Sequence, residues 1–183
     1  MATNNAVTNG RVMPRQQVPE LSVPTLDADT WTLSEQNPEN FTAIFFYRGY
    51  HCPQCKLQVR DIDRNIDKFT ELGVNVIVIS SNTEEFAQKT KEEWGVENVT
   101  IGYDLSLETA RKWGLFLSDS IKPTEPERFS EPGIFFVRPD GTLYASIIST
   151  MPFARPDTKT IVAALKTVIE KEYPARGEVS IFS

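Results

Sequence analysis

Cys52 and Cys55 are the residues of this chain best suited to chemistry, because they stand three positions apart as Cys-Pro-Gln-Cys. They are the only two cysteines among the 183 residues. A pair so close in sequence cannot form a framework of long-range disulfide staples. Its spacing is instead typical of a dithiol that is oxidised to a local disulfide and reduced again. We therefore expect the two sulfurs to act in a redox cycle.

The residues around the dithiol predict that it lies where a strand gives way to a helix. Residues 41–47 (FTAIFFY) are typical of a strand covered on both faces. After Cys55, apolar residues recur at helical spacing up to Gly73. Pro53 suits the first turn of that helix, because its missing N–H would have had no partner there. Cys52 is thereby placed at the amino end of the helix.

A thiolate is stabilised at the amino end of a helix by unpaired N–H groups and by the helix dipole. Such positions lower a cysteine pKa below its free value of about 8.5. We therefore predict that Cys52 is the nucleophile. Cys55, one turn further on, is predicted to be the resolving thiol, which attacks a mixed disulfide or a sulfenic acid on Cys52.

Two basic residues flank the dithiol, and two other interpretations of the cysteines stay open. Arg48 and His51 would add positive potential that favours the thiolate, or orient an oxygen substrate. Arg48 could equally be a solvated strand end, and His51 an exposed loop residue.

The cysteines could also be ordinary core residues. A zinc site would need four ligands, and the chain offers two cysteines and one histidine at an unsuitable spacing. We expect neither a metal nor another cofactor.

The remaining hydrophobic patterns predict an α/β fold with a central mixed sheet and helices on both faces. A short hairpin is expected over residues 19–34, and the 115–131 stretch is expected to be an irregular connection. The expected strands are 41–47, 74–80, 100–103, 134–137 and 143–148. One expected helix is the one that follows Cys55, and three more span 81–94, 106–113 and 157–173. The last two strands are joined by Arg-Pro-Asp-Gly, a turn sequence.

Length and composition predict one domain, residues 18–175, without staples or structural metals. Residues 1–17 are expected to be a flexible leader or an arm that orders only against the body, and 176–183 a C-terminal tail. The net charge of -6 argues against a nucleic-acid partner. No apolar stretch is long enough to span a membrane and no signal core is found, so we expect a cytoplasmic protein.

With these motifs in view, the chain resembles the alkyl hydroperoxide reductase C / thiol-specific antioxidant family. The resemblance rests on residues 47–55 (YRGYHCPQC), on residues 132–141 (PGIFFVRPDG) and on the lead-in SVPTLDADTWTLSE. It implies a thioredoxin-like fold and thiol-based reduction of peroxides or disulfides. It also implies that Pro132 is a cis-proline that packs beside the cysteines, although about 95% of X–Pro bonds are trans.

The chain departs from this family at two positions. Typical members carry Thr-x-x-Cys, whereas Cys52 stands three before Cys55 and Gly49 stands three before Cys52. Pro132 stands where typical members place an arginine ahead of a late strand. If Cys52 aligns with the threonine, Cys55 takes the place of the peroxidatic sulfur and the two roles are exchanged.

The leading prediction is a thiol–disulfide oxidoreductase of the peroxiredoxin-like branch that cycles between the dithiol and a Cys52–Cys55 disulfide. The enzymatic alternative is a peroxidase that uses the same sulfurs on hydrogen peroxide or an alkyl hydroperoxide. A third reading is a redox sensor or binding module without turnover. The cycle needs an external thiol reductant, such as a thioredoxin or glutathione system, and the sequence leaves a homodimer open.

Overall fold

The fold is built around β3 (Phe41–Phe46), in which every residue is buried. The computed structural model describes residues 11–27 and 30–180. β3 lies in the middle of a five-stranded sheet with the order β5-β4-β3-β8-β9. β4 (Val74–Ile79) and β5 (Thr100–Gly102) continue the sheet in parallel on one side. β8 (Gly133–Val137) and β9 (Leu143–Ile148) extend it antiparallel on the other.

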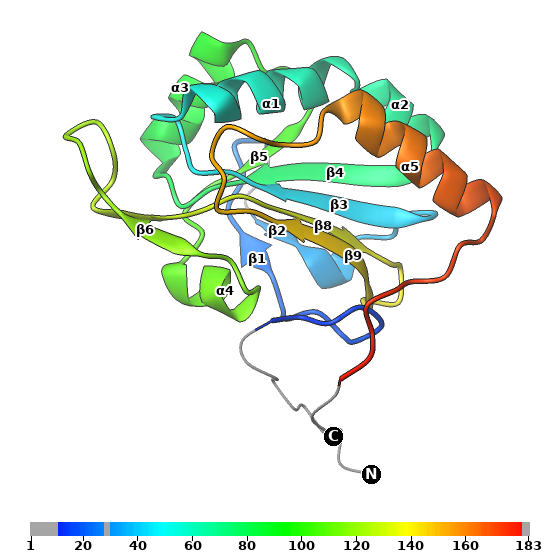
Figure 1. The fold of residues 1–183 in the computed structure, drawn as a ribbon. Helices are drawn as coiled ribbons and strands as arrows, with labels where there is room; N and C mark the ends of the chain where they lie inside the picture. Colours follow the sequence, from blue (N-terminus) through cyan, green and yellow to red (C-terminus); the bar gives the residue numbers. More distant parts are fainter. Residues whose placement is uncertain (1–10, 28–29, 181–183) are drawn as a thin grey trace.

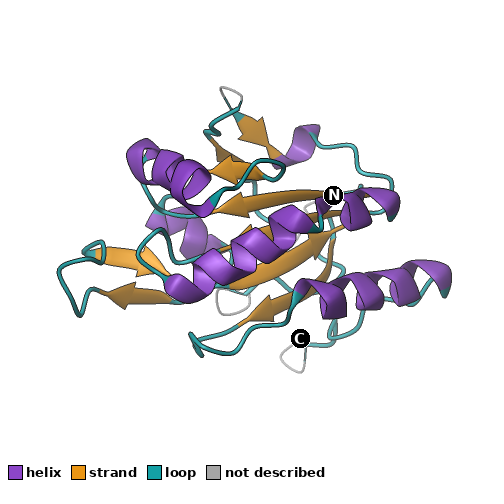
Figure 2. Ribbon diagram, turned by 90° about the horizontal axis from the view of Figure 1, so that it is seen from above, coloured by secondary structure: helices purple, strands orange, loops and turns teal. Residues whose placement is uncertain are grey.

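Helices cover both faces of this sheet (Figures 1 and 2). One face carries α1 (Pro53–Arg64), α2 (Ile66–Glu71), α3 (Glu84–Trp94) and α5 (Thr158–Glu170). The other carries α4 (Leu107–Lys112), the short 3-10 helix η1 (Leu33–Glu35) and the pair β1 (Ser22–Val23) and β2 (Trp31–Thr32). The predicted fold class, a thioredoxin-like α/β fold with a mixed sheet and an N-terminal hairpin, is confirmed.

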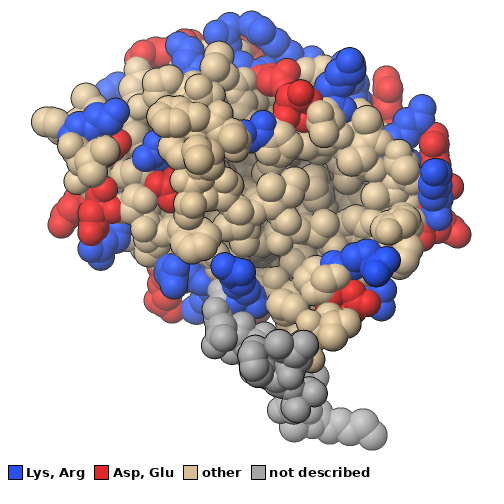
Figure 3. Space-filling model, viewed as in Figure 1, with Lys and Arg blue, Asp and Glu red and all other residues tan. Residues whose placement is uncertain are grey.

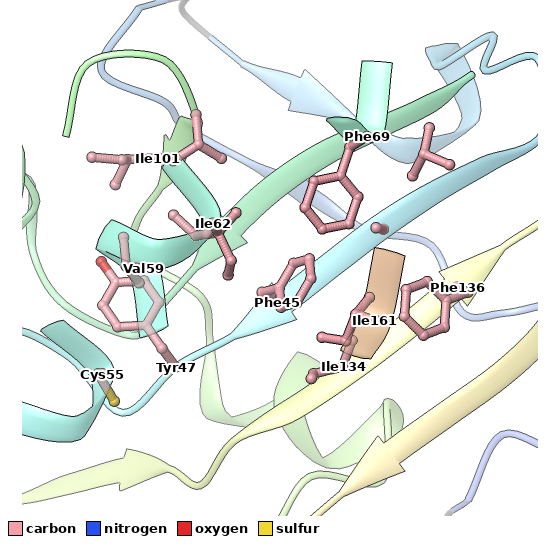
Figure 4. Packing of buried hydrophobic residues seen from close by; sticks show 14 of the residues in the cluster. Phe45, Tyr47, Cys55, Val59, Ile62, Phe69, Ile101, Ile134, Phe136 and Ile161 are labelled. Atoms are coloured by element: carbon pink, nitrogen blue, oxygen red, sulfur yellow. The ribbon is translucent and has the colours of Figure 1, made fainter. Parts of the chain in front are cut away.

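Two hydrophobic clusters fill the space between the sheet and its two coverings. The larger cluster joins β3, β4 and β8 to α1, α3 and α5, and it includes both cysteines. Figure 4 shows Cys55 at one end of this cluster, near Tyr47 and Val59. Burial raises the pKa of Tyr47 to about 12, so its hydroxyl stays neutral.

The structure differs from the sequence prediction in two segments. The stretch 115–131 is not wholly irregular, because β6 (Leu117–Asp119) and β7 (Arg128–Ser130) pair as an antiparallel hairpin. The helix after Cys55 is also divided in two at Asn65, whose side chain donates to the backbone oxygen of Asp61 at 2.7 Å. Strands of three residues carry too little periodicity to be recognised in sequence.

The predicted leader is an arm ordered on the body in its described part. Arg15 N–H donates to Leu143 O at 2.7 Å, and Gln17 forms a bridge with Thr142. Residues 1–10 and 181–183 lie outside the described residues, so the ends of the predicted leader and tail do too.

β9 forms one edge of the sheet.

Figure 3 shows charged side chains mostly around the border of the face seen in Figure 1, with uncharged side chains over its middle. Among the described residues, no helix is long and apolar enough to cross a membrane.

Candidate active site

The turn after β3 delivers the first cysteine to the start of α1. Tyr47 N–H donates to Ile79 O at 3.0 Å, which extends the β3–β4 ladder by one residue. Gly49 then turns the chain with a φ of 134°, a conformation that favours glycine. A Cβ on Gly49 would lie 2.7 Å from Oδ1 of Asn82, the atom that accepts the Tyr50 N–H at 2.7 Å. The turn is therefore tightly fitted against the loop that follows β4.

Cys52 caps the amino end of α1. Its backbone is extended (φ −103°, ψ 109°), and its sulfur accepts the backbone N–H of Cys55 at 3.3 Å. Pro53 occupies the first turn, as predicted from its missing N–H. The sulfur of Cys52 thus accepts an N–H that has no partner within the helix, at the positive end of the helix dipole.

Both cysteines are free thiols in an almost closed site. The exposed fraction is 2% for Cys52 and 0% for Cys55. The side-chain hydrogen bond from Cys55 contributes most to lowering the pKa of Cys52, from an ordinary 9.0 to about 5; burial opposes this, and the Cys55 N–H and the charges of Arg155 and Arg48 add to it. Burial, together with the neighbouring Cys52 sulfur, raises the pKa of Cys55 well above its ordinary value. The favoured state is a Cys52 thiolate beside a protonated Cys55.

Arg155 lies against both sulfurs and was missed by the sequence analysis. It belongs to the loop between β9 and α5, a hundred residues beyond Cys55. Its Nη1 lies 3.1 Å from Cys55 Sγ and 3.1 Å from Gln58 Oε1, and its Nη2 lies 3.8 Å from Cys52 Sγ. The guanidinium is nearer to Cys55, but the Cys55 N–H and the lesser burial of Cys52 favour the charge on Cys52.

Arg48 is held by partners other than the cysteines. Its Nε lies 3.3 Å from Glu131 Oε2, and its guanidinium lies over the Phe129 ring at 4.8 Å. Glu131 also accepts the hydroxyl of Ser118 at 2.6 Å. Arg48 therefore anchors the turn to the β6–β7 hairpin, and it contributes to the low pKa of Cys52 only through its charge.

His51 packs edge-on against Phe129, with ring centroids 4.7 Å apart. Burial lowers its pKa to about 4, and the charge of Arg48 acts in the same direction. The imidazole is therefore neutral at pH 7 and supplies no positive charge to the thiolate, which corrects one of the two roles expected for it. Both ring nitrogens are buried without a hydrogen-bond partner within the described part of the chain.

Pro132 is buried ahead of β8, but its peptide bond is trans, because the described residues contain no cis peptide bond. The expectation of a cis-proline is therefore wrong. Glu131 N–H donates to Phe116 O at 2.7 Å, and Pro132 O accepts the Ser149 N–H at 3.4 Å. These pairings carry the chain from β7 into β8 in an extended path that a trans bond fits.

A pocket of about 200 Å³ adjoins the turn that leads into Cys52. It is lined on one side by Tyr50 and His51, on another by residues 81–83 and Phe86, and by residues 123–126 of the β6–β7 hairpin. No group of three or more His, Cys, Asp or Glu residues that could hold a metal ion occurs among residues 11–27 and 30–180. The charged group that lies against the two sulfurs is the guanidinium of Arg155.

Comparisons with known proteins agree on the family and the fold. The model of the AhpC/TSA family matches residues 14–146. A solved peroxiredoxin 6 mutant of Arenicola marina is 16% identical, with a TM-score of 0.73 over 88% of this chain and 76% of that chain. A reduced Prx3 of Vibrio vulnificus in complex with hydrogen peroxide is also 16% identical, with a TM-score of 0.71 over 84% of this chain and 99% of that chain. The peroxidoxin BcpB of Mycobacterium tuberculosis is 16% identical, with a TM-score of 0.70 over 86% and 99%. No curated protein matches the chain.

Proposed function

This chain belongs to the AhpC/TSA family of thiol-dependent peroxidases and oxidoreductases, and from that premise we propose that it reduces peroxides through a Cys52–Cys55 dithiol cycle. The observation that carries the proposal is the position of the Cys52 sulfur at the amino end of α1, where it accepts the Cys55 N–H at 3.3 Å and lies, like the Cys55 sulfur, against the Arg155 guanidinium. A thiolate is the nucleophile in thiol redox chemistry, and a guanidinium offers several N–H donors to oxygen atoms.

The proposed reaction has two steps at sulfur. The Cys52 thiolate attacks one peroxide oxygen, the O–O bond breaks, and the leaving oxygen takes a proton to depart as water or an alcohol. Cys52 is then a sulfenic acid. The Cys55 thiol attacks the Cys52 sulfur, water leaves, and a Cys52–Cys55 disulfide remains. Arg155 can donate hydrogen bonds to the peroxide oxygens while the charge moves from sulfur to the leaving oxygen.

The closed state of the site favours a small oxidant over a protein disulfide. Cys52 is 2% exposed, so a large disulfide cannot reach its sulfur without a movement of the protein. We therefore propose peroxide reduction as the main activity, ahead of the thiol–disulfide exchange favoured by the sequence. The Vibrio vulnificus relative, which was solved with hydrogen peroxide, is consistent with this order.

The cycle closes only if an external thiol reduces the disulfide. We propose a thioredoxin or glutathione system for that step, as predicted from the sequence. The homodimer and the cytoplasmic location stay predictions.

The test mixes the reduced protein with one equivalent of hydrogen peroxide and follows the thiols by stopped flow. We expect two thiols to be lost far faster than from an unactivated cysteine, with an intact mass two hydrogens lower. Cys52→Ser should abolish the fast phase, whereas Cys55→Ser should keep it and stop at a sulfenic acid. Oxidation no faster than that of a free thiol, together with rapid reduction of a cystine peptide, would instead establish disulfide exchange.

A further inference from the structure

The loop between β9 and α5, residues 149–157, passes near the amino end of α1 (Figure 1). Its Arg155 lies against the two cysteines there. We call it the Arg155 loop. Its tip is exposed, with exposed fractions of 55% for Met151 and 78% for Phe153. At one end, Ser149 N–H donates to Pro132 O at 3.4 Å. Just beyond the other end, Thr158 N–H donates to Asp61 Oδ2 at 3.0 Å.

Between these two anchors, the side chain of Arg155 makes the polar contacts of the Arg155 loop with the body. Within the described part of the chain, the hydrogen bonds that join residues 152–156 to other elements of the fold are those of the Arg155 guanidinium. Two of its three partners are the cysteine sulfurs and the third is the amide oxygen of Gln58. The closed position of the loop therefore depends on the state of the dithiol.

The charge of Arg155 is balanced by the dithiol. Across residues 11–27 and 30–180, Arg155 forms no salt bridge with a carboxylate. It is partly buried, and its Nε is buried without a hydrogen-bond partner among those residues. Burial alone would lower the pKa of Arg155, but the negative charge and hydrogen bonds of the two sulfurs raise it. The thiolate is thus the anion that stabilises this guanidinium.

Oxidation removes that anion. In the dithiol cycle, a Cys52 thiolate and a Cys55 thiol become an uncharged disulfide, and two electrons and one proton pass to the peroxide, which takes one more proton from solvent as it is reduced. Gln58 is then the remaining strong acceptor of Arg155. A partly buried cation that has lost its counter-ion is destabilised relative to one in water.

We propose that the Arg155 loop is a redox latch, closed on the reduced dithiol and released when the Cys52–Cys55 disulfide forms. This inference rests on the dithiol cycle proposed above. Release gives a reductant thiol access to the Cys52 sulfur, which is 2% exposed when the loop is closed. The latch therefore opens the site at the stage of the cycle in which a thiol has to enter.

The test measures how fast chymotrypsin cuts after Phe153, in the exposed tip of the Arg155 loop, with fragments quantified by intact mass. When a loop opens and closes quickly, its rate of cleavage tracks the population of its open state. The samples are the reduced protein, the protein oxidised with diamide, Cys52→Ser and Arg155→Gln. Arg128→Gln is the matched control, because Arg128 pairs with Asp119 on the exposed β6–β7 hairpin.

We expect the disulfide form, Cys52→Ser and reduced Arg155→Gln to be cut on the order of tenfold faster than the reduced protein, the effect of losing one hydrogen-bonded charge pair. Arg128→Gln should behave as the wild type in both redox states. Equal rates for the reduced protein, its disulfide and Arg155→Gln would overturn the latch. If diamide leaves the mass unchanged, the dithiol cycle fails, and Cys52→Ser and Arg155→Gln still decide the latch, because neither depends on disulfide formation.

Discussion

Replacing Arg155 by glutamine should raise the pKa of Cys52, because it removes a positive charge that lies against the Cys52 sulfur. Arg155 Nη2 lies 3.8 Å from Cys52 Sγ. Two unit charges about 4 Å apart interact by roughly 4 kcal/mol at an effective dielectric constant of about 20. Because Arg155 is only partly buried and its other terminal nitrogen is held by Cys55, screening by solvent and side-chain motion reduce this to about 1–2 kcal/mol. One pKa unit corresponds to about 1.4 kcal/mol, so the pKa should rise by about one unit.

The assay follows the ultraviolet absorbance of the thiolate against pH in wild type, Arg155→Gln and the control Arg128→Gln. We expect the midpoint near 5 in the wild type to move to about 6 in Arg155→Gln, and to stay in place in Arg128→Gln. At pH 7 roughly nine-tenths of Cys52 would still be a thiolate in Arg155→Gln. A much larger loss of peroxide rate at pH 7 would then report a direct contact between Arg155 and the peroxide. An unchanged midpoint, or an equal shift in Arg128→Gln, would refute the assigned role of Arg155.

Three further predictions concern stability. The pKa of Cys52 is about 5 in the folded protein and 9.0 ordinarily, so between these two pH values the unfolded chain binds more protons than the folded protein. The free energy of unfolding of the reduced protein, measured by urea denaturation, should therefore rise with pH from about 5 to 9. Cys52→Ser should lack that contribution. Asp63→Ala should lower the free energy of unfolding by about 3 kcal/mol, because the buried carboxylate accepts three backbone N–H groups from residues 97–99, whereas Asp63→Asn should lose about half as much. Gly49→Ala should cost about 2 kcal/mol or more in the same assay, because its φ is 134° and the new Cβ would meet Asn82; a cost near zero would contradict the fitted turn.

The core of the fold could be predicted because its signals are local. The continuous apolar run of β3, the helical spacing after Cys55 and the Arg-Pro-Asp-Gly turn between β8 and β9 each depend on neighbouring residues. The Cys52 side of the site was predictable for the same reason, since a strand, a turn and a helix in sequence determine where the first sulfur lies. The hairpin of β6 and β7 was missed because each strand has only three residues.

The charged surroundings of the dithiol could not be predicted, because they come from tertiary contacts. Arg155 lies in an irregular segment without periodicity, a hundred residues beyond Cys55, and nothing in its neighbours marks it. His51 was given a role in favouring the thiolate, but its burial against Phe129 lowers its pKa to about 4. Burial is set by the partner element and not by the two or three residues on either side.

A sulfenic-acid trap identifies directly which of the two sulfurs attacks peroxide. Cys55→Ser and Cys52→Ser would each be treated with one equivalent of hydrogen peroxide in the presence of a sulfenic-acid trap and mapped by peptide mass. We expect rapid trapping on Cys52 in Cys55→Ser, and no rapid trapping in Cys52→Ser. Rapid trapping on Cys55 in Cys52→Ser, with none on Cys52 in Cys55→Ser, would contradict this assignment and show that Cys55 is the nucleophile.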